Sequence, residues 1–201
     1  MLRQTIHKVI SEEIKDGERV LDLGCGDGAL LQYLIKNKNV KGHGIDISDD
    51  MIIKCIEKGL SVIQLDLDNL PLDFPTKFFD IVVLNQTIQQ IYDSKGMIME
   101  MLRIGKKGIL GFPNFGTLPI RLKFLFYGTM PVSKELPYKW YDTPNIHLLT
   151  IKDFKIFCKE NGIKIKKEIY LKRKFLSDKY KKIKLFPNLR AELAVFIISK
   201  D

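Results

Sequence analysis

The feature that most limits the possible fold is the segment from Val20 to Gly28, which reads VLDLGCGDG. An apolar run that contains an acid leads into a turn with glycine at every second position, and a helical pattern begins at Ala29. Glycine lets the backbone approach a ligand closely, and a helix N-terminus offers unpaired N–H groups that suit an anionic or carboxylate-bearing ligand. The segment therefore predicts a strand–turn–helix unit with a ligand at the turn.

Strand and helix patterns alternate along the chain, which predicts an α/β fold with a doubly wound, mostly parallel sheet. The expected strands are Arg19–Leu23, Val40–Ile47, Ser61–Leu65, Asp80–Leu84 and Gly105–Leu110, and the expected helices are 2–14, Ala29–Lys36, 48–59, Lys95–Ile104 and 150–162. We expect Ile163–Leu171 and Glu192–Ser199 to pair as a C-terminal antiparallel unit.

One stretch fits neither pattern. Residues 113–149 are rich in proline and aromatic side chains and follow a parallel strand. We therefore expect a single domain over residues 1–201, in which 113–149 form a lid or a partner-binding insertion over the carboxyl edge of the sheet. Doubly wound sheets bind their ligands at that edge.

Composition narrows the class of protein. Of the 201 residues 45% are apolar, which suffices for one core without disulfides or metals. The three cysteines, Cys25, Cys55 and Cys158, form no Cys-x-x-Cys motif, so neither a disulfide framework nor a zinc site is expected. The longest apolar stretch, Leu193–Ile198, is too short to span a bilayer, and no signal-peptide pattern is present. We expect a cytoplasmic protein that does not bind membranes.

The positive charge is concentrated late in the chain. The net charge is +9, and Lys164–Arg190 holds eleven Lys or Arg residues against two acids, with 22 of each sign elsewhere. Such a stretch can meet nucleic acid, an acidic partner or a phosphate-bearing substrate, or it can be a solvated lysine-rich face.

Three acids lie at the carboxyl ends of consecutive strands and indicate which ligand the turn binds. The glycines alone are ambiguous, because Gly24, Gly26 and Ala29 also match the pattern of NAD-binding domains. Asp22 can face the ammonium of a methionine moiety but would repel a dinucleotide pyrophosphate. Asp46 is placed for ribose hydroxyls, and Asp66 for an adenine amino group. The three acids favour S-adenosylmethionine, and the alternative is three solvated turn aspartates.

These motifs resemble the class I S-adenosylmethionine-dependent methyltransferases and, more closely, the MetW family of methionine-biosynthesis proteins. Beyond Val20–Gly28, the resemblance rests on LNQTIQ (84–89), FPNFG (112–116), MPV (130–132) and LPYKWYDTPNIHL (136–148), so that it covers nearly the whole chain. It implies a Rossmann-like fold, S-adenosylmethionine or S-adenosylhomocysteine as cofactor, and a homoserine O-acyltransferase as the partner whose activity the protein supports. It does not establish a methyl-transfer reaction.

The resemblance also implies a cofactor site, with no metal. In the general methyltransferase pattern Asp22 and the turn from Gly24 to Gly28 hold the methionine end, Asp46 the ribose, and Asp66 with Leu67 the adenine. The expected cofactor-binding residues are Asp22, Leu23, Gly24, Cys25, Gly26, Gly28, Asp46, Ile47, Asp66, Leu67, Asn85 and Gln86, the last two beside the sulfonium.

No general base is evident. Many small-molecule methyltransferases place a histidine just after the fourth strand, where this chain has Gln89 and Gln90. Of the three histidines, His7 and His43 are expected to be structural, and His147 is open between a structural and a functional role. The weak catalytic candidates are Tyr138, Tyr141, Asp142 and His147, in a cluster that can act as a lid, bind a substrate or meet a partner.

Two functions therefore stay open: an S-adenosylmethionine-binding partner of homoserine acylation, which the missing base favours, and a true methyltransferase acting on a small-molecule acceptor. A nucleic-acid methyltransferase is disfavoured. Residues Asn85–Ile88 are neither an Asn/Asp-Pro-Pro-aromatic motif nor a Pro-Cys nucleophile.

Overall fold

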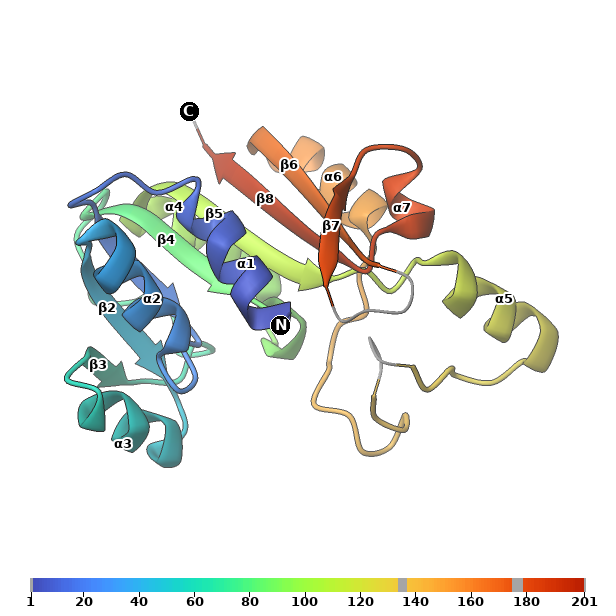
Figure 1. Cartoon of the computed structure of the whole chain (residues 1–201), viewed down its shortest axis with the longest axis horizontal. Helices are drawn as coiled ribbons and strands as arrows, with labels where there is room; N and C mark the ends of the chain where they lie inside the picture. Colours follow the sequence, from blue (N-terminus) through green and yellow to red (C-terminus); the bar gives the residue numbers. More distant parts are fainter. Residues whose placement is uncertain (1, 134–136, 175–178, 201) are drawn as a thin grey trace.

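One mixed sheet forms the centre of the computed structural model, which describes residues 2–133, 137–174 and 179–200 (Figure 1). Its strand order is β3-β2-β1-β4-β5-β8-β6-β7. The strands are β1 (Arg19–Leu23), β2 (Lys41–Asp46), β3 (Ser61–Gln64), β4 (Phe79–Asn85), β5 (Gly105–Pro113), β6 (Lys164–Arg173), β7 (Tyr180–Ile183) and β8 (Leu193–Ser199). Pairs from β3 to β5 are parallel, and the pairs that involve β6, β7 or β8 are antiparallel. The predicted α/β, mostly parallel fold is confirmed.

Helices cover both faces of this sheet. They are α1 (Leu2–Ser11), α2 (Ala29–Lys38), α3 (Asp49–Glu57), the 3-10 turn η1 (Ile88–Gln90), α4 (Ser94–Ile104), α5 (Leu118–Tyr127), α6 (Ile151–Glu160) and α7 (Pro187–Arg190). Side chains of β4 alternate between two buried clusters, because successive residues of a strand point to opposite faces. Ile81 and Val83 pack with α1 and α2, while Val82 and Leu84 pack with α4 and α6. In Figure 1, α1 and α2 lie in front of the sheet and α4 lies behind it.

The C-terminal part of the sheet is larger than the expected strand pair. Strand β8 inserts between β5 and β6, so that it has partners on both sides, and all its residues are buried. Strand β7 adds an edge that the sequence analysis did not predict. Burial on both faces explains why Leu193–Ile198 is an unbroken apolar run, whereas the short β7 has two exposed lysines at its centre and no buried residue.

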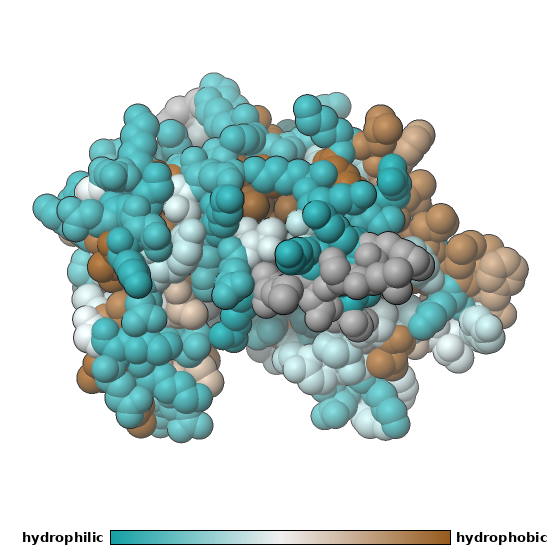
Figure 2. Space-filling model, viewed as in Figure 1, coloured by the Kyte–Doolittle hydropathy of each residue, from teal (hydrophilic) through white to brown (hydrophobic). Residues whose placement is uncertain are grey.

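Helix α5 lies within the segment 113–149 for which no regular element was expected. Thr117 precedes it, Pro119 occupies its first turn, and Gly128 ends it in a left-handed conformation with φ of 63°. None of its residues is buried, and Leu125, Phe126 and Tyr127 are each more than 70% exposed. The helix projects from the sheet in Figure 1 and forms much of the apolar surface at the right of Figure 2.

None of the helices within the three described ranges has both the length and the apolar character needed to cross a bilayer.

Candidate functional site

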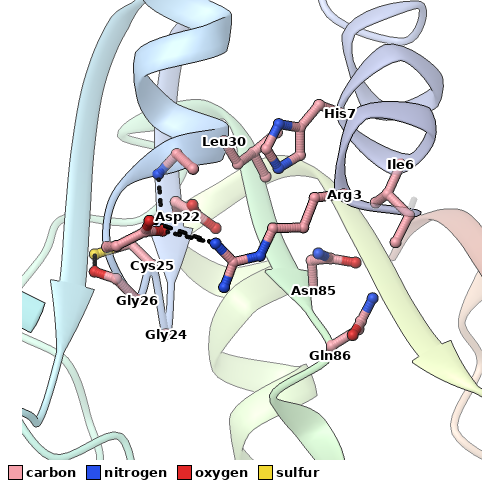
Figure 3. Close-up of a pocket in the computed structure, with 12 residues that line it drawn as sticks. Arg3, Ile6, His7, Asp22, Gly24, Cys25, Gly26, Leu30, Asn85 and Gln86 are labelled. Carbon is pink, nitrogen blue, oxygen red and sulfur yellow. Dashed lines mark hydrogen bonds and ion pairs between the residues drawn. The ribbon is translucent and has the colours of Figure 1, made fainter. Parts of the chain in front are cut away.

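A pocket of about 180 Å³ opens at the Gly-rich turn, between α1 and the carboxyl ends of β1 and β4 (Figure 3). It is lined by Arg3, Ile6, His7, Asp22, Gly24, Cys25, Gly26, Asp27, Ala29, Leu30, Asn85 and Gln86. The structure thus brings together six of the predicted cofactor residues: Asp22, Gly24, Cys25, Gly26, Asn85 and Gln86.

The glycines of the turn have different tasks. Gly24, Gly26 and Gly28 all have positive φ, between 55° and 70°, which L side chains adopt at a cost. A Cβ at Gly24 would lie 2.6 Å from the Thr87 side chain, and a Cβ at Gly28 would lie 2.8 Å from the Cys55 Sγ, whereas nothing lies within 4 Å at Gly26. Gly24 and Gly28 therefore permit tight packing, and Gly26 leaves the pocket open.

Four N–H groups of this turn have acceptors within the chain, and the expectation that the helix N-terminus offers unpaired N–H groups stays a prediction. The N–H groups of Gly24 and Cys25 donate to the carbonyl of Ile45, at 2.8 and 2.9 Å. That of Gly26 donates to the Asp46 carboxylate at 2.7 Å, and that of Gly28 to the Cys25 carbonyl at 3.0 Å. The close approach of β2 supplies the acceptors of Gly24, Cys25 and Gly26, so these three N–H groups are not free for an anionic ligand group.

Asp22 is the most perturbed acid of the pocket. It is 3% exposed within β1. Burial, and secondarily the nearby Asp46 carboxylate, raise the pKa of Asp22 to about 7. Burial penalises the charged form of this carboxyl group. A cation bound beside it would offset that penalty and favour the ionised carboxylate. Burial and Asp22 also raise the pKa of the Cys25 thiol well above its usual value, so Cys25 is unsuited to act as a nucleophile.

The other predicted cofactor residues lie outside this pocket. Leu23 is fully buried in the core, and Leu67 packs into the same cluster. The two Asp46 oxygens accept hydrogen bonds from the N–H groups of Gly26 and Ser48, and Asp66 accepts one from the N–H of Asp68.

Ile47, after the end of β2, is 62% exposed, and Gly28 serves packing. Direct ligand contacts of Asp46, Ile47, Asp66 and Leu67 stay predictions.

Asn85 and Gln86 reach the pocket because β4 ends beside β1. Gln86 has a positive φ of 60°, and its N–H donates to the Gly111 carbonyl at 2.7 Å, which fixes the chain where it leaves β4. The buried Oδ1 of Asn85 has no hydrogen-bond partner in the described part of the chain. The two amide side chains lie opposite Arg3 in Figure 3.

Sequence reasoning missed the contribution of α1. Arg3, Ile6 and His7 line the pocket, and Arg3 forms an ion pair with Asp27 at 3.4 Å. Burial, and secondarily Arg3, lower the pKa of His7. The apolar stripe of this helix predicted packing, and Ile6 and Ile10 are indeed buried, but nothing in the stripe indicates that its N-terminal end meets a turn more than twenty residues later.

A second pocket, of about 240 Å³, shares Gln86 with the first. Its walls include Gln89 and Gln90 from η1 and Tyr138 and Asn145 from the segment 113–149. Gln89 is 5% exposed, and its Nε2 donates to the Gln86 carbonyl at 2.7 Å. That contact assigns the amide orientation and leaves the buried Oε1 without a partner among the described residues.

The structure brings only one of the weak catalytic candidates to this pocket. Of Tyr138, Tyr141, Asp142 and His147, only Tyr138 lines this second pocket. Tyr141 is 64% exposed, and Asp142 is exposed. His147 is anchored to η1: its N–H donates to the Gln89 carbonyl at 3.0 Å, and its Nε2 lies 3.1 Å from the Tyr92 carbonyl oxygen. This anchoring is what a structural histidine requires.

The described part of the basic segment 164–190 lies on β6, β7 and α7 and partly faces the turn that follows α1. Lys167 contacts Glu13 and Lys182 contacts Glu12, both at 2.6 Å. Residues 175–178 lie outside the described residues. Some of the positive charge thus serves packing between the two ends of the chain.

Comparison with known proteins identifies the family. A family model described as "Methionine biosynthesis protein MetW" matches residues 4–198. The chain belongs to the MetW family. A relative in Rhodopirellula baltica, named "Bifunctional methionine biosynthesis protein MetXA/MetW", is 30% identical over 96% of this chain. The chain spans only 32% of that relative's length.

Solved structures agree on the fold. A methyltransferase of Thermotoga maritima, described as a possible histamine N-methyltransferase, superposes with a TM-score of 0.69 at 18% identity, covering 95% of this chain and 86% of that one. Magnesium protoporphyrin IX methyltransferase of Synechocystis, solved with bound S-adenosylhomocysteine, gives 0.66 at 16% identity, covering 99% and 81%. At such identities the likeness shows a class I methyltransferase fold and no more.

Proposed function

We propose that this MetW-family protein binds S-adenosylmethionine or S-adenosylhomocysteine in the pocket between α1 and the Gly-rich turn. The observation that carries the proposal is Asp22, an acid 3% exposed whose pKa is raised to about 7 at the pocket wall. A ligand ammonium placed there offsets the cost of burying the charge. A dinucleotide would instead bring a pyrophosphate toward Asp22, Asp27 and Asp46, which repel it.

The comparisons support this ligand. The superposable Synechocystis enzyme holds S-adenosylhomocysteine. The pocket contains only the part of the predicted set that serves the methionine end. The adenosine would therefore extend past the end of β2, toward Asp46, Ile47 and Asp66.

We further infer that the protein acts in the cytoplasm with a homoserine O-acyltransferase in methionine biosynthesis. Family membership carries this inference, and the Rhodopirellula relative combines MetXA and MetW in one bifunctional chain. A partner needs a surface, and two neighbouring segments offer exposed aromatic side chains: α5, and the turn that holds Trp140 and Tyr141, which are 77% and 64% exposed.

Calorimetric titration tests the ligand. We expect S-adenosylmethionine to bind in preference to NAD, and Asp46→Ala to weaken binding by about tenfold to a hundredfold, since a hydrogen bond to a charged group contributes roughly 1.5 to 3 kcal/mol. Asp50→Ala, an exposed acid of α3 outside the pocket, is the matched control. Equal affinity for NAD contradicts the assignment. Acyltransferase activity with and without this protein, at saturating S-adenosylmethionine, tests the partner.

The second pocket favours the alternative function, a methyltransferase with a small acceptor. It adjoins the first pocket at Gln86, and the Gln89 Oε1 is a buried acceptor that requires a donor. None of its described lining residues is a cation, so the pocket suits an alcohol or amine rather than a carboxylate or phosphate. Release of S-adenosylhomocysteine on adding an amino alcohol such as ethanolamine, lost in Gln89→Met, would support this alternative.

A further inference from the structure

The charges of the first pocket are unequal. Its described lining residues include two carboxylates, Asp22 and Asp27, and only one cation, Arg3, because the lowered pKa of His7 keeps that imidazole neutral near pH 7. A ligand that carries an amino-acid end brings an ammonium and a carboxylate. Asp22 suits the ammonium, which leaves the carboxylate in need of a donor in a pocket otherwise rich in negative charge.

Four N–H groups of the Gly-rich turn are already engaged. The N–H groups of Gly24, Cys25, Gly26 and Gly28 are each hydrogen-bonded to a protein oxygen at 3.0 Å or less. To bind an anion they would have to leave those acceptors, and a buried backbone acceptor without a donor is costly. A cationic side chain at the pocket wall can pair with a carboxylate without breaking these hydrogen bonds.

Arg3 is placed for this task. It extends from the first turn of α1 toward the Gly-rich turn, with Asn85 and Gln86 on the other side of its guanidinium (Figure 3). The only hydrogen bonds of its side chain within the described ranges are from Nη1 to the two Asp27 oxygens, both 3.4 Å long. The side chain is 74% exposed, so the guanidinium has free N–H groups and little holds it in place.

Asp27 would keep a partner if Arg3 turned to a ligand. Lys58 from the end of α3 approaches the Asp27 carboxylate to 3.5 Å. Arg3 and Lys58 both lower the pKa of Asp27, against the opposing effect of its partial burial. The movement of Arg3 therefore leaves no unpaired acid behind.

We propose that Arg3 is the carboxylate receptor of this site: it pairs with the carboxylate of the bound ligand's amino-acid end, while Asp22 holds the ammonium. The planar guanidinium can offer two parallel N–H donors to a carboxylate. Helix α1 thereby becomes part of the binding site, and it selects S-adenosyl compounds with an intact amino-acid end over those that lack the carboxylate. This inference rests on the proposed ligand.

A thermodynamic cycle that combines variants of Arg3 with two ligands tests this proposal. Affinities for S-adenosylmethionine and for decarboxylated S-adenosylmethionine, which keeps the amine and the sulfonium, are measured by calorimetry on wild type, Arg3→Ala and Arg3→Lys. The control is Lys8→Ala, which removes the same charge from an exposed position of α1 outside the pocket. We expect Arg3→Ala to weaken S-adenosylmethionine binding by about tenfold to a hundredfold. We expect decarboxylated ligand to bind this variant no more weakly than it binds wild type, Arg3→Lys to be intermediate, and Lys8→Ala to match wild type.

Two outcomes overturn the assignment of Arg3: an equal loss for both ligands in Arg3→Ala, which makes Arg3 structural, or no loss for either. Unfolding temperatures of the three variants, expected to equal that of wild type, exclude a folding defect. If wild type does not bind S-adenosylmethionine, the proposed function itself is wrong and the role of Arg3 falls with it.

Discussion

The Gly-rich turn and helix α5 show opposite ways of holding a backbone in place. Around the turn, Ile45 and Asp46 of β2 accept three N–H groups, and Thr87, Cys55 and Leu60 fill the space beside Gly24 and Gly28. Helix α5 buries none of its residues, and nothing lies within 4 Å of a Cβ placed at Gly128, which ends it. Tertiary contacts with distant residues therefore fix the turn. Helix α5 is held by its own backbone hydrogen bonds, and most of its apolar side chains stay exposed.

The largest expected effect sharpens this comparison. In Gly24→Ala the new methyl group meets Thr87 Cγ2 and Oγ1 at 2.6 Å, so rotating the threonine side chain only exchanges one clash for another. Overpacking and the left-handed backbone together should cost about 2 to 5 kcal/mol of unfolding free energy. Gly128→Ala, with the same positive φ but open space, should cost about 1 to 2 kcal/mol. Urea unfolding measures both, and equal losses would show that packing does not determine the turn.

An effect of intermediate size, on stability, tests the raised pKa of Asp22. Because folding raises the pKa of Asp22 to about 7, the folded state holds a proton that the unfolded chain loses near pH 4. This group therefore lowers stability as pH rises from about 4 to about 7, and the full penalty remains above pH 7. We expect Asp22→Asn to unfold at a higher temperature than wild type at pH 8 and at about the same temperature at pH 4.

The same variant should bind S-adenosylmethionine about tenfold to a hundredfold more weakly at pH 8, since the ammonium loses its carboxylate. Calorimetry measures this change, with Asp50→Asn as control. A variant that is no more stable than wild type at pH 8 would contradict the raised pKa, whatever its affinity.

The smallest expected effect on stability lies in the segment 113–149. Trp140 and Tyr141 contact each other, with ring centroids 5.6 Å apart, and both are mostly exposed. Trp140→Ala and Tyr141→Ala should therefore change the unfolding free energy by no more than about 0.5 kcal/mol while lowering activation of the acyltransferase. A loss of about 3 to 5 kcal/mol, as for a core aromatic residue, would make the segment structural.

The sequence predicted the elements whose burial imposes a regular pattern of apolar residues. Strands β1 and β4 are apolar runs because helices cover both of their faces, and their expected positions hold to within a residue or two. The capping box of α6 was also visible, in Thr150 and Asp153. Strand β7 was missed because a short edge strand with two exposed lysines at its centre carries no such signal, and α5 because it has no buried face to give it a period.

The sequence alone determined the α/β order, the acid within β1 and the glycines that follow it, since these depend on neighbours in the chain. Only the tertiary structure decided which N–H groups of the turn have acceptors, and that the N-terminal end of α1 covers the pocket. Those facts arise from pairings between distant residues, such as Gly24 with Ile45 and Arg3 with Asp27. A turn motif indicates where a ligand binds, but the free donors are known only once the neighbouring strand and helix are in place.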